Sequence, residues 1–257
     1  MTKLIGQNHT NLLNWLSQEW LHNRSAICFL EGFPGVGKST LGYELARQVS
    51  GRDAIGGYGK WTAVKVDMPE GANAFEDLLL GLSEELSDEG HDKITDAIKD
   101  GKSLEQAFTV VLHRPILIVI DEFQRALLPE TGQPLKALED IFRKIANRPN
   151  TLGRLLLLSN RLIEQDAPWS EPYVVRRMPA LEVLEAEQLL GQLLKEEKKE
   201  SDVPIERRRD VVNWLGLNPR AMNVLVGCLE QESLDDLIGI SPESWELKDR
   251  EVSEGHL

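Results

Sequence analysis

The sequence predicts an α/β fold in which a five-stranded parallel, doubly wound sheet is followed by a small all-helical domain. Two observations lead to this prediction. Short apolar runs alternate with stretches of helical periodicity in the first part of the chain, and strand signals stop after Pro179. This alternation is typical of parallel sheets that carry helices on both faces, because both faces of each strand are then buried.

Five apolar segments are the expected strands. They are residues 26–30, 61–66, 116–120, 155–158 and 173–175. The helices expected before and between them are residues 11–21, 40–49, 72–86, 103–112 and 135–146. Ligands of such sheets bind at the carboxyl ends of the strands, so we expect a binding site at that edge.

After Pro179 the chain reads as helices. Three are expected, at residues 183–200, 206–215 and 220–230. We therefore expect a core domain over residues 1–178, a helical lid domain over residues 179–240 and a polar tail over residues 241–257. A chain of 257 residues with 41% hydrophobic residues has enough apolar surface for two hydrophobic cores.

The composition excludes several classes of protein. The 42 acidic and 29 basic residues give a formal charge of −13, which argues against a broad nucleic-acid interface but is compatible with a local basic patch. Cys28 and Cys228 lie in an expected strand and an expected helix, so no disulfide framework is expected. The sequence has neither a signal peptide nor an apolar run long enough to span a membrane, so we expect a cytoplasmic protein without membrane contact.

A glycine-rich loop follows the first expected strand. Residues 32–39 read Gly-Phe-Pro-Gly-Val-Gly-Lys-Ser, a complete Walker A loop between a strand and a helix. Its glycines let backbone N–H groups turn inward around phosphate oxygens, and the helix N-terminus adds its positive dipole end. Lys38 is expected to reach the terminal phosphates, and the Ser39 hydroxyl to coordinate Mg²⁺. The expected nucleotide-binding residues of this segment are Gly32, Pro34, Gly35, Val36, Gly37, Lys38, Ser39 and Thr40.

The third expected strand has the form of a Walker B strand. Five branched apolar residues, Ile116 to Ile120, are followed by Asp121 and Glu122. Asp121 is expected to hold Mg²⁺ through its water shell, because Mg²⁺ takes few direct protein ligands. Glu122 is placed to orient and deprotonate a water for attack on the γ-phosphate. The pair therefore predicts ATP hydrolysis, whereas the simpler interpretation is a strand end capped by surface acids.

Two further segments carry candidate nucleotide contacts. The fourth expected strand ends in Ser159, Asn160 and Arg161, where an amide can position the attacking water and a guanidinium can stabilise phosphate charge. In the lid, Asn218 and Pro219 fit a helix cap and a first helical turn. That structural interpretation is sufficient by itself. The functional one places Pro219 against the base or ribose and Arg220 near the phosphates.

Together these motifs resemble the STAND class of P-loop ATPases, the signal-transducing switches that include innate-immunity receptors and bacterial anti-phage sensors. Residues 4–7 before an amphipathic helix are similar to the motif that supports the adenine in that class, which implies nucleotide contacts for Ile5 and Gln7. The class usually has arginine where this chain has Gln7. Residues 159–161 resemble the sensor whose final arginine reads the γ-phosphate, and residues 216–221 resemble the glycine-and-proline motif of the lid.

This resemblance implies a switch that is controlled by ATP and ADP with Mg²⁺, that hydrolyses ATP slowly, and that assembles with itself or with partner proteins. Members of the class usually carry a winged-helix domain, a repeat sensor and an effector domain. The chain is therefore expected to be the switch core of a larger protein, or a small member that works with partner chains. A P-loop kinase and a pseudo-ATPase with structural nucleotide are further alternatives, and the Asp121–Glu122 pair disfavours the kinase.

The chain also resembles the related AAA+ ATPases, in which Asn160 would be a first sensor and Arg220 a second. This resemblance implies a remodelling or DNA-transaction ATPase, of loader or transposition-regulator type, with nucleic acid as a less favoured partner. Such enzymes normally place an arginine before the fifth strand to complete a neighbour's site. Residues 162–172 contain no arginine, which leaves Arg176 or Arg177 for that role.

Overall fold

The computed structural model describes residues 6–22, 25–71, 73–91, 95–96, 104–148, 151–161 and 169–238. Its centre is a five-stranded sheet of order β2-β3-β4-β1-β5 in which every neighbouring pair is parallel. The strands are β1 (Ile27–Glu31), β2 (Thr62–Asp67), β3 (Ile116–Asp121), β4 (Arg154–Ser159) and β5 (Val174–Arg177). The predicted five-stranded parallel fold is therefore confirmed.

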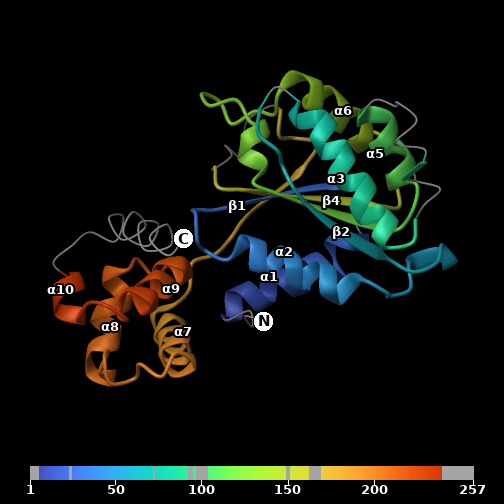
Figure 1. Ribbon diagram of the computed structural model, residues 1–257. Coiled ribbons are helices and arrows are strands. Elements are labelled where there is room, and N and C mark those ends of the chain that lie inside the picture. The colour runs from blue at the N-terminus through green and yellow to red at the C-terminus, as the bar shows by residue number, and fades with distance from the viewer. Residues whose placement is uncertain are drawn as a thin grey trace.

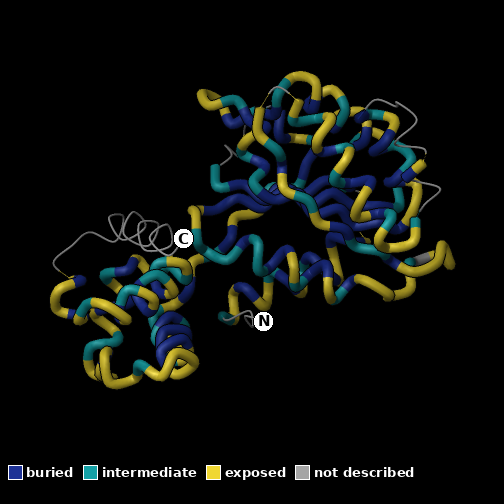
Figure 2. Tube along the Cα trace, viewed as in Figure 1, coloured by how far each residue is buried: buried dark blue, intermediate teal, exposed yellow. Residues whose placement is uncertain are grey.

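The three inner strands are buried along their whole length because helices cover both faces of the sheet (Figures 1 and 2). One face carries α1 (Gln7–Gln18) and α2 (Lys38–Val49); the other carries α3 (Ala74–Asp88), α5 (Leu104–Leu112) and α6 (Lys136–Ala146). Alternate residues of β1 serve the two faces. Ile27 and Phe29 pack with the second set of helices, while Cys28 and Leu30 pack with the first.

One helix start and three short turns of this part differ from expectation. Helix α1 begins at Gln7, directly after Gly6, whose φ of 107° lies in the left-handed region. Apolar periodicity alone placed this start at residue 11. Short 3-10 turns, η1 (Trp20–His22), η2 (Ile55–Gly57) and η3 (Phe123–Ala126), were not expected either. Cys28 and Cys228 form no disulfide, as expected.

The carboxyl-terminal helices have a hydrophobic core of their own. They are α7 (Val183–Glu196), α8 (Ile205–Trp214), α9 (Pro219–Cys228) and α10 (Leu234–Ile238). The core is built from residues between Leu181 and Leu237. Helix α10 was not expected. The predicted tail, residues 241–257, lies outside the described residues. No helix among the described residues is long and apolar enough to cross a membrane.

Phe29 of β1 lies at the centre of an aromatic cluster. Its side chain has no exposed surface, and its ring centroid lies 5.5–6.0 Å from those of Phe123, Trp169 and Tyr173. Phe142 lies slightly further away, at 6.5 Å. The cluster joins β1 to the turn that follows β3, so it fixes the strand that leads into the glycine-rich loop.

We expect Phe29→Ala to lower the free energy of unfolding by about 3–5 kcal/mol, because the cavity left among rigid rings cannot close. Phe33→Ala is the matched control, since Phe33 is 65% exposed, and it should change stability by less than about 0.5 kcal/mol. Urea unfolding followed by tryptophan fluorescence measures both. Equal losses in the two variants would contradict the central role of the cluster.

Candidate functional site

The glycine-rich loop connects β1 to α2 through left-handed backbone. Gly35 has φ 79° and Gly37 has φ 99°, conformations that side-chain-bearing residues rarely adopt. Gly37 is the residue before the first turn of α2, so the loop ends at a helix N-terminus. Left-handed turns and helix N-termini present backbone N–H donors to anions, so the loop has the conformation of an anion-binding site.

Lys38 lies inside the loop. Its side chain is 5% exposed, and its ammonium donates hydrogen bonds to the carbonyl oxygens of Gly32 at 2.8 Å and Phe33 at 2.9 Å. Burial lowers the pKa of Lys38 to about 8, while the nearby carboxylates of Asp121 and Glu122 act in the opposite direction. A phosphate group at the loop would supply the full countercharge that the buried ammonium lacks.

Asp121 ends β3 and Glu122 follows it; both lie near this loop, because β4 alone separates β3 from β1. The Asp121 side chain is 8% exposed, and its Oδ1 accepts a hydrogen bond from the Glu122 amide at 2.8 Å. Glu122 has φ 53°, a left-handed conformation that is unusual for a residue other than glycine. Backbone strain of this kind clusters at functional sites, and here it redirects the chain immediately after the strand.

A cavity of about 320 Å³ opens between the loop and the lid. Its size lies at the lower end of the range for small-molecule sites. The lining residues that the sequence predicted are Pro34, Gly35, Val36, Gly37, Lys38, Ser39, Thr40, Glu122, Asn160, Pro219 and Arg220. Four lining residues were not predicted: His9, Leu181, Leu189 and Asn223.

The lid helix α9 is hydrogen-bonded to the glycine-rich loop. The Asn218 amide donates to the Pro34 carbonyl at 2.9 Å, and the Arg220 backbone N–H donates to the Gly35 carbonyl at 3.3 Å. The same Asn218 side chain caps α9, since its Oδ1 accepts from the backbone N–H groups of Arg220 and Ala221. The predicted helix cap at Asn218 is therefore confirmed, and the cap also bridges the two parts of the chain.

The end of β5 and the residue after it are tied to neighbouring elements of the core. Glu31 is fully buried, and its carboxylate accepts from Arg177 at 2.9 Å. Its carbonyl accepts from the Met178 amide at 2.7 Å. The Arg176 guanidinium lies 4.3 Å from the centre of the Trp15 ring. Arg176 and Arg177, the two candidates for completing the site of a neighbouring chain, thus both have partners within this chain.

Residues 21–165 match the family model described as AAA domain, which is more than half of the chain. The chain belongs to the AAA domain family. Two solved structures are similar to it: C. elegans PCH-2, with 15% identity, a TM-score of 0.54 and coverage of 95% of this chain and 71% of that one, and domain III of the Thermotoga maritima replication initiation protein DnaA, with 16% identity, a TM-score of 0.51 and coverage of 92% and 95%.

At these identities the likeness shows a shared fold. None of the curated proteins compared with the chain matches it. Membership of the AAA domain family implies nucleotide binding, and the Walker A loop of this AAA domain is the segment with the geometry for it. The donor chemistry also fits Mg²⁺, because the Ser39 hydroxyl and the Asp121 carboxylate supply the oxygen ligands that this ion prefers. These two residues would hold it.

Some of the predicted nucleotide-binding residues do not line the cavity. The Gln7 side chain donates to Asn11 at 2.8 Å, and its backbone N–H donates to Glu185 of the lid at 2.5 Å. The lining includes Asn160 but neither Arg161 nor Gly32. Asp121 is not among the lining residues either, and Ile5 lies outside the described residues. The roles assigned to these residues stay predictions.

The lining residues that the sequence did not predict come from packing between distant segments. His9 is 3% exposed, and its Nε2 lies 2.7 Å from the Pro179 carbonyl, which joins α1 to the start of the lid. Leu181 and Leu189 add apolar surface from the lid opposite the loop. Nothing in the sequence marks these positions as cavity residues, because His9 precedes the expected helix start, Leu181 precedes α7, and Leu189 is one of several apolar residues of that helix.

The lowered pKa of Lys38 predicts pH-dependent nucleotide affinity of this AAA domain. Phosphates bind the charged ammonium, so affinity should fall as the pH rises through about 8, where Lys38 loses its proton. Between about pH 7 and about pH 9 the charged fraction, and with it the affinity, should fall about tenfold. Titration with a fluorescent ADP analogue measures this. Lys38→Met, which has no titrating group, should bind at most weakly and show no such fall; a wild-type affinity that stays constant would contradict the assignment.

Proposed function

We propose that the chain is an ATP-binding and ATP-hydrolysing molecular switch of the STAND kind, in which bound ADP holds the lid on the glycine-rich loop and exchange for ATP releases it. One observation carries this proposal. The lid helix α9 donates two hydrogen bonds directly to carbonyls of the loop that would bind the phosphates, from Asn218 to Pro34 and from Arg220 to Gly35.

The start of α9 packs closely against the loop at Gly35. A Cβ atom at Gly35 would lie 2.5 Å from the Asn218 Oδ1 and 2.6 Å from the Arg220 Cβ, distances that real side chains essentially never show. The lid and the loop therefore cannot shift past each other while both hydrogen bonds are kept. A change of loop geometry on phosphate binding would therefore change the contacts of α9 with the loop.

A ligand shifts such an equilibrium only if it interacts differently with the two lid positions. ADP and ATP differ by the γ-phosphate, which adds charge and volume inside a cavity of about 320 Å³ that the docked lid partly encloses. Arg220 and Asn160 both line this cavity and can respond to the added group. ADP fits beneath the docked lid, whereas ATP favours a position in which Asn218 and Arg220 have left the loop.

Hydrolysis then resets the switch. Glu122 lines the cavity and would orient and deprotonate the attacking water, and Lys38 with Asn160 would stabilise the charge that develops on the phosphate. The released lid offers surfaces for self-association or for a partner protein. Signalling or anti-phage defence in a bacterium are settings in which STAND switches work, and this chain fits such a role.

Variants of Lys38 and Glu122 test the assigned roles. Lys38→Ala should abolish nucleotide binding in equilibrium dialysis, because it removes the charge inside the loop. Glu122→Gln should bind ATP as the wild type does but retain it unhydrolysed, because an amide cannot accept the proton from water. Thin-layer chromatography of the bound nucleotide after an hour separates the outcomes. Equal ATP retention by wild type and Glu122→Gln would count against the catalytic role.

Asn218→Asp tests the lid contact. An aspartate keeps the oxygen that caps α9 but turns a carboxylate toward the Pro34 carbonyl, so the hydrogen bond across the two parts is replaced by repulsion. We expect ADP to dissociate about tenfold faster, which corresponds to the loss of about 1.4 kcal/mol, with little change in melting temperature. Stopped-flow release of a fluorescent ADP analogue measures the rate.

Asn213→Asp is the matched control for this variant, because it adds the same charge at an exposed position of α8 in the lid. It should release ADP at the wild-type rate. Release from Asn218→Asp at the wild-type rate would contradict the proposal, and so would equal acceleration in both variants.

A remodelling or DNA-transaction ATPase of the AAA+ type is the second candidate. The AAA domain match favours it, as does Arg220, which lines the cavity at the start of α9 where a second sensor would lie. The copurifying nucleotide and the mass in solution separate the two functions. ADP in a monomer with slow turnover supports the switch, whereas rapid, DNA-stimulated turnover by a ring supports the remodelling enzyme.

A further inference from the structure

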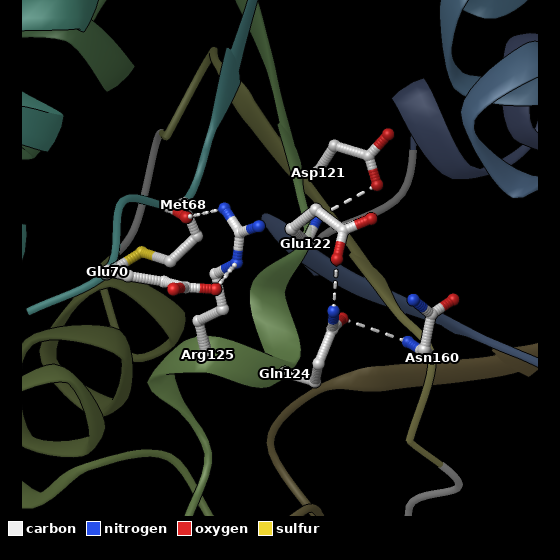
Figure 3. Close-up of polar contacts among 7 residues, drawn as sticks. All are labelled: Met68, Glu70, Asp121, Glu122, Gln124, Arg125 and Asn160. Carbon is white, nitrogen blue, oxygen red and sulfur yellow. Dashed lines mark hydrogen bonds and ion pairs between the residues drawn. The ribbon is translucent and has the colours of Figure 1, made fainter. Parts of the chain in front are cut away.

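Gln124 connects two cavity residues from neighbouring strands. Its side-chain amide N–H donates to the Oε2 of Glu122, and its amide oxygen accepts from the backbone N–H of Asn160 at 3.1 Å. Figure 3 shows the Gln124 side chain between the end of β3 and the end of β4. Glu122 and Asn160 line the cavity, but Gln124 does not. Gln124 can therefore act on the nucleotide only through its two partners.

The turn that carries Gln124 is fixed on both sides. The preceding residue, Phe123, is fully buried in the aromatic cluster around Phe29. The following residue, Arg125, donates to the Met68 carbonyl at 2.8 Å and pairs with Glu70 at 2.9 Å, as Figure 3 also shows. Gln124 is thus held on a short 3-10 turn whose position is set by a ring cluster and by the segment after β2.

A rigid donor is what a glutamate in this position requires. The Glu122 side chain has three rotatable bonds, so its carboxylate takes one position only when a hydrogen-bond partner holds it. The Gln124 hydrogen bond occupies one carboxylate oxygen and leaves the other as a proton acceptor. The second bond, to Asn160, sets the distance of that carboxylate from the end of β4.

We propose that Gln124 is the positioning residue of this site: a two-ended clamp that holds the Glu122 carboxylate in register with Asn160. This rests on the proposed function, in which Glu122 activates water and Asn160 meets the γ-phosphate. If γ-phosphate binding shifts the end of β4, the Gln124 side chain transmits that shift to Glu122. The clamp therefore makes hydrolysis depend on how Asn160 lies.

Steady-state kinetics of Gln124→Leu test the clamp. Leucine has a similar volume but neither polar end, so kcat should fall at least about tenfold while the KM for ATP and the Kd for ADP stay within about twofold. The matched control is Gln133→Leu, which removes a side-chain hydrogen bond to another glutamate, Glu139, away from the cavity. The control should keep the wild-type kcat. An unchanged or raised kcat in Gln124→Leu, or an equal fall in the control, would overturn the proposal.

A second variant and a second readout separate failure of the clamp from failure of the proposed function. Gln124→Glu keeps an acceptor for the Asn160 amide but loses the donor to Glu122, so kcat should fall as in Gln124→Leu. Hydrogen exchange of the Asn160 backbone amide, followed by NMR without nucleotide, should speed up at least about tenfold in Gln124→Leu and stay slow in Gln124→Glu. If the wild type binds ATP without turnover, the catalytic role proposed for Glu122 is wrong. The exchange rates of the Asn160 amide alone then test whether Gln124 holds the two residues together. Equal exchange in all three proteins overturns the clamp.

Discussion

The structure of the site depends on the close approach of the lid helix α9 to the glycine-rich loop at Gly35. Only a residue without a side chain leaves room there for Asn218 and Arg220, and the left-handed φ of 79° makes the same demand on the backbone. Because the loop would also hold the phosphates, the same short segment would contact both α9 and the nucleotide. The cavity exists because α9, α7 and α1 meet over this loop.

Sheet order brings the remaining groups to the same place. The parallel order β3-β4-β1 puts the carboxyl ends of three inner strands side by side, so Glu122, Asn160 and the loop after Glu31 lie at one edge. The aromatic cluster around Phe29 and the Arg125 contacts with Met68 and Glu70 hold these ends in position. Glu31 and Met178 link the same edge to the chain that enters the lid. Burial of the Lys38 ammonium in the loop lowers its pKa to about 8.

The sequence predicted those parts of the site that are encoded locally. The Walker A loop, the Walker B strand and the Asn218 cap are each short patterns with a backbone requirement, and each lies where it was expected. Contacts between distant segments could not be predicted in this way. Gln124 lies on the short turn η3 that follows the Walker B strand, yet its second partner, Asn160, is 36 residues away, just after β4. His9 was missed because α1 begins earlier than its apolar pattern indicates, and α10 because five residues carry too little periodicity.

The distance between core and lid in the two nucleotide states tests the central claim most directly. Spin labels are attached to cysteines that replace Tyr58 in the core and Ile205 in the lid, which are 62% and 77% exposed. The background variant carries Glu122→Gln and Cys228→Ser. Pulsed electron resonance then gives the distance distribution with ADP and with ATP. The account predicts one narrow distribution with ADP and a shifted or broadened one with ATP, as α9 leaves the loop. Identical distributions in the two states would contradict it.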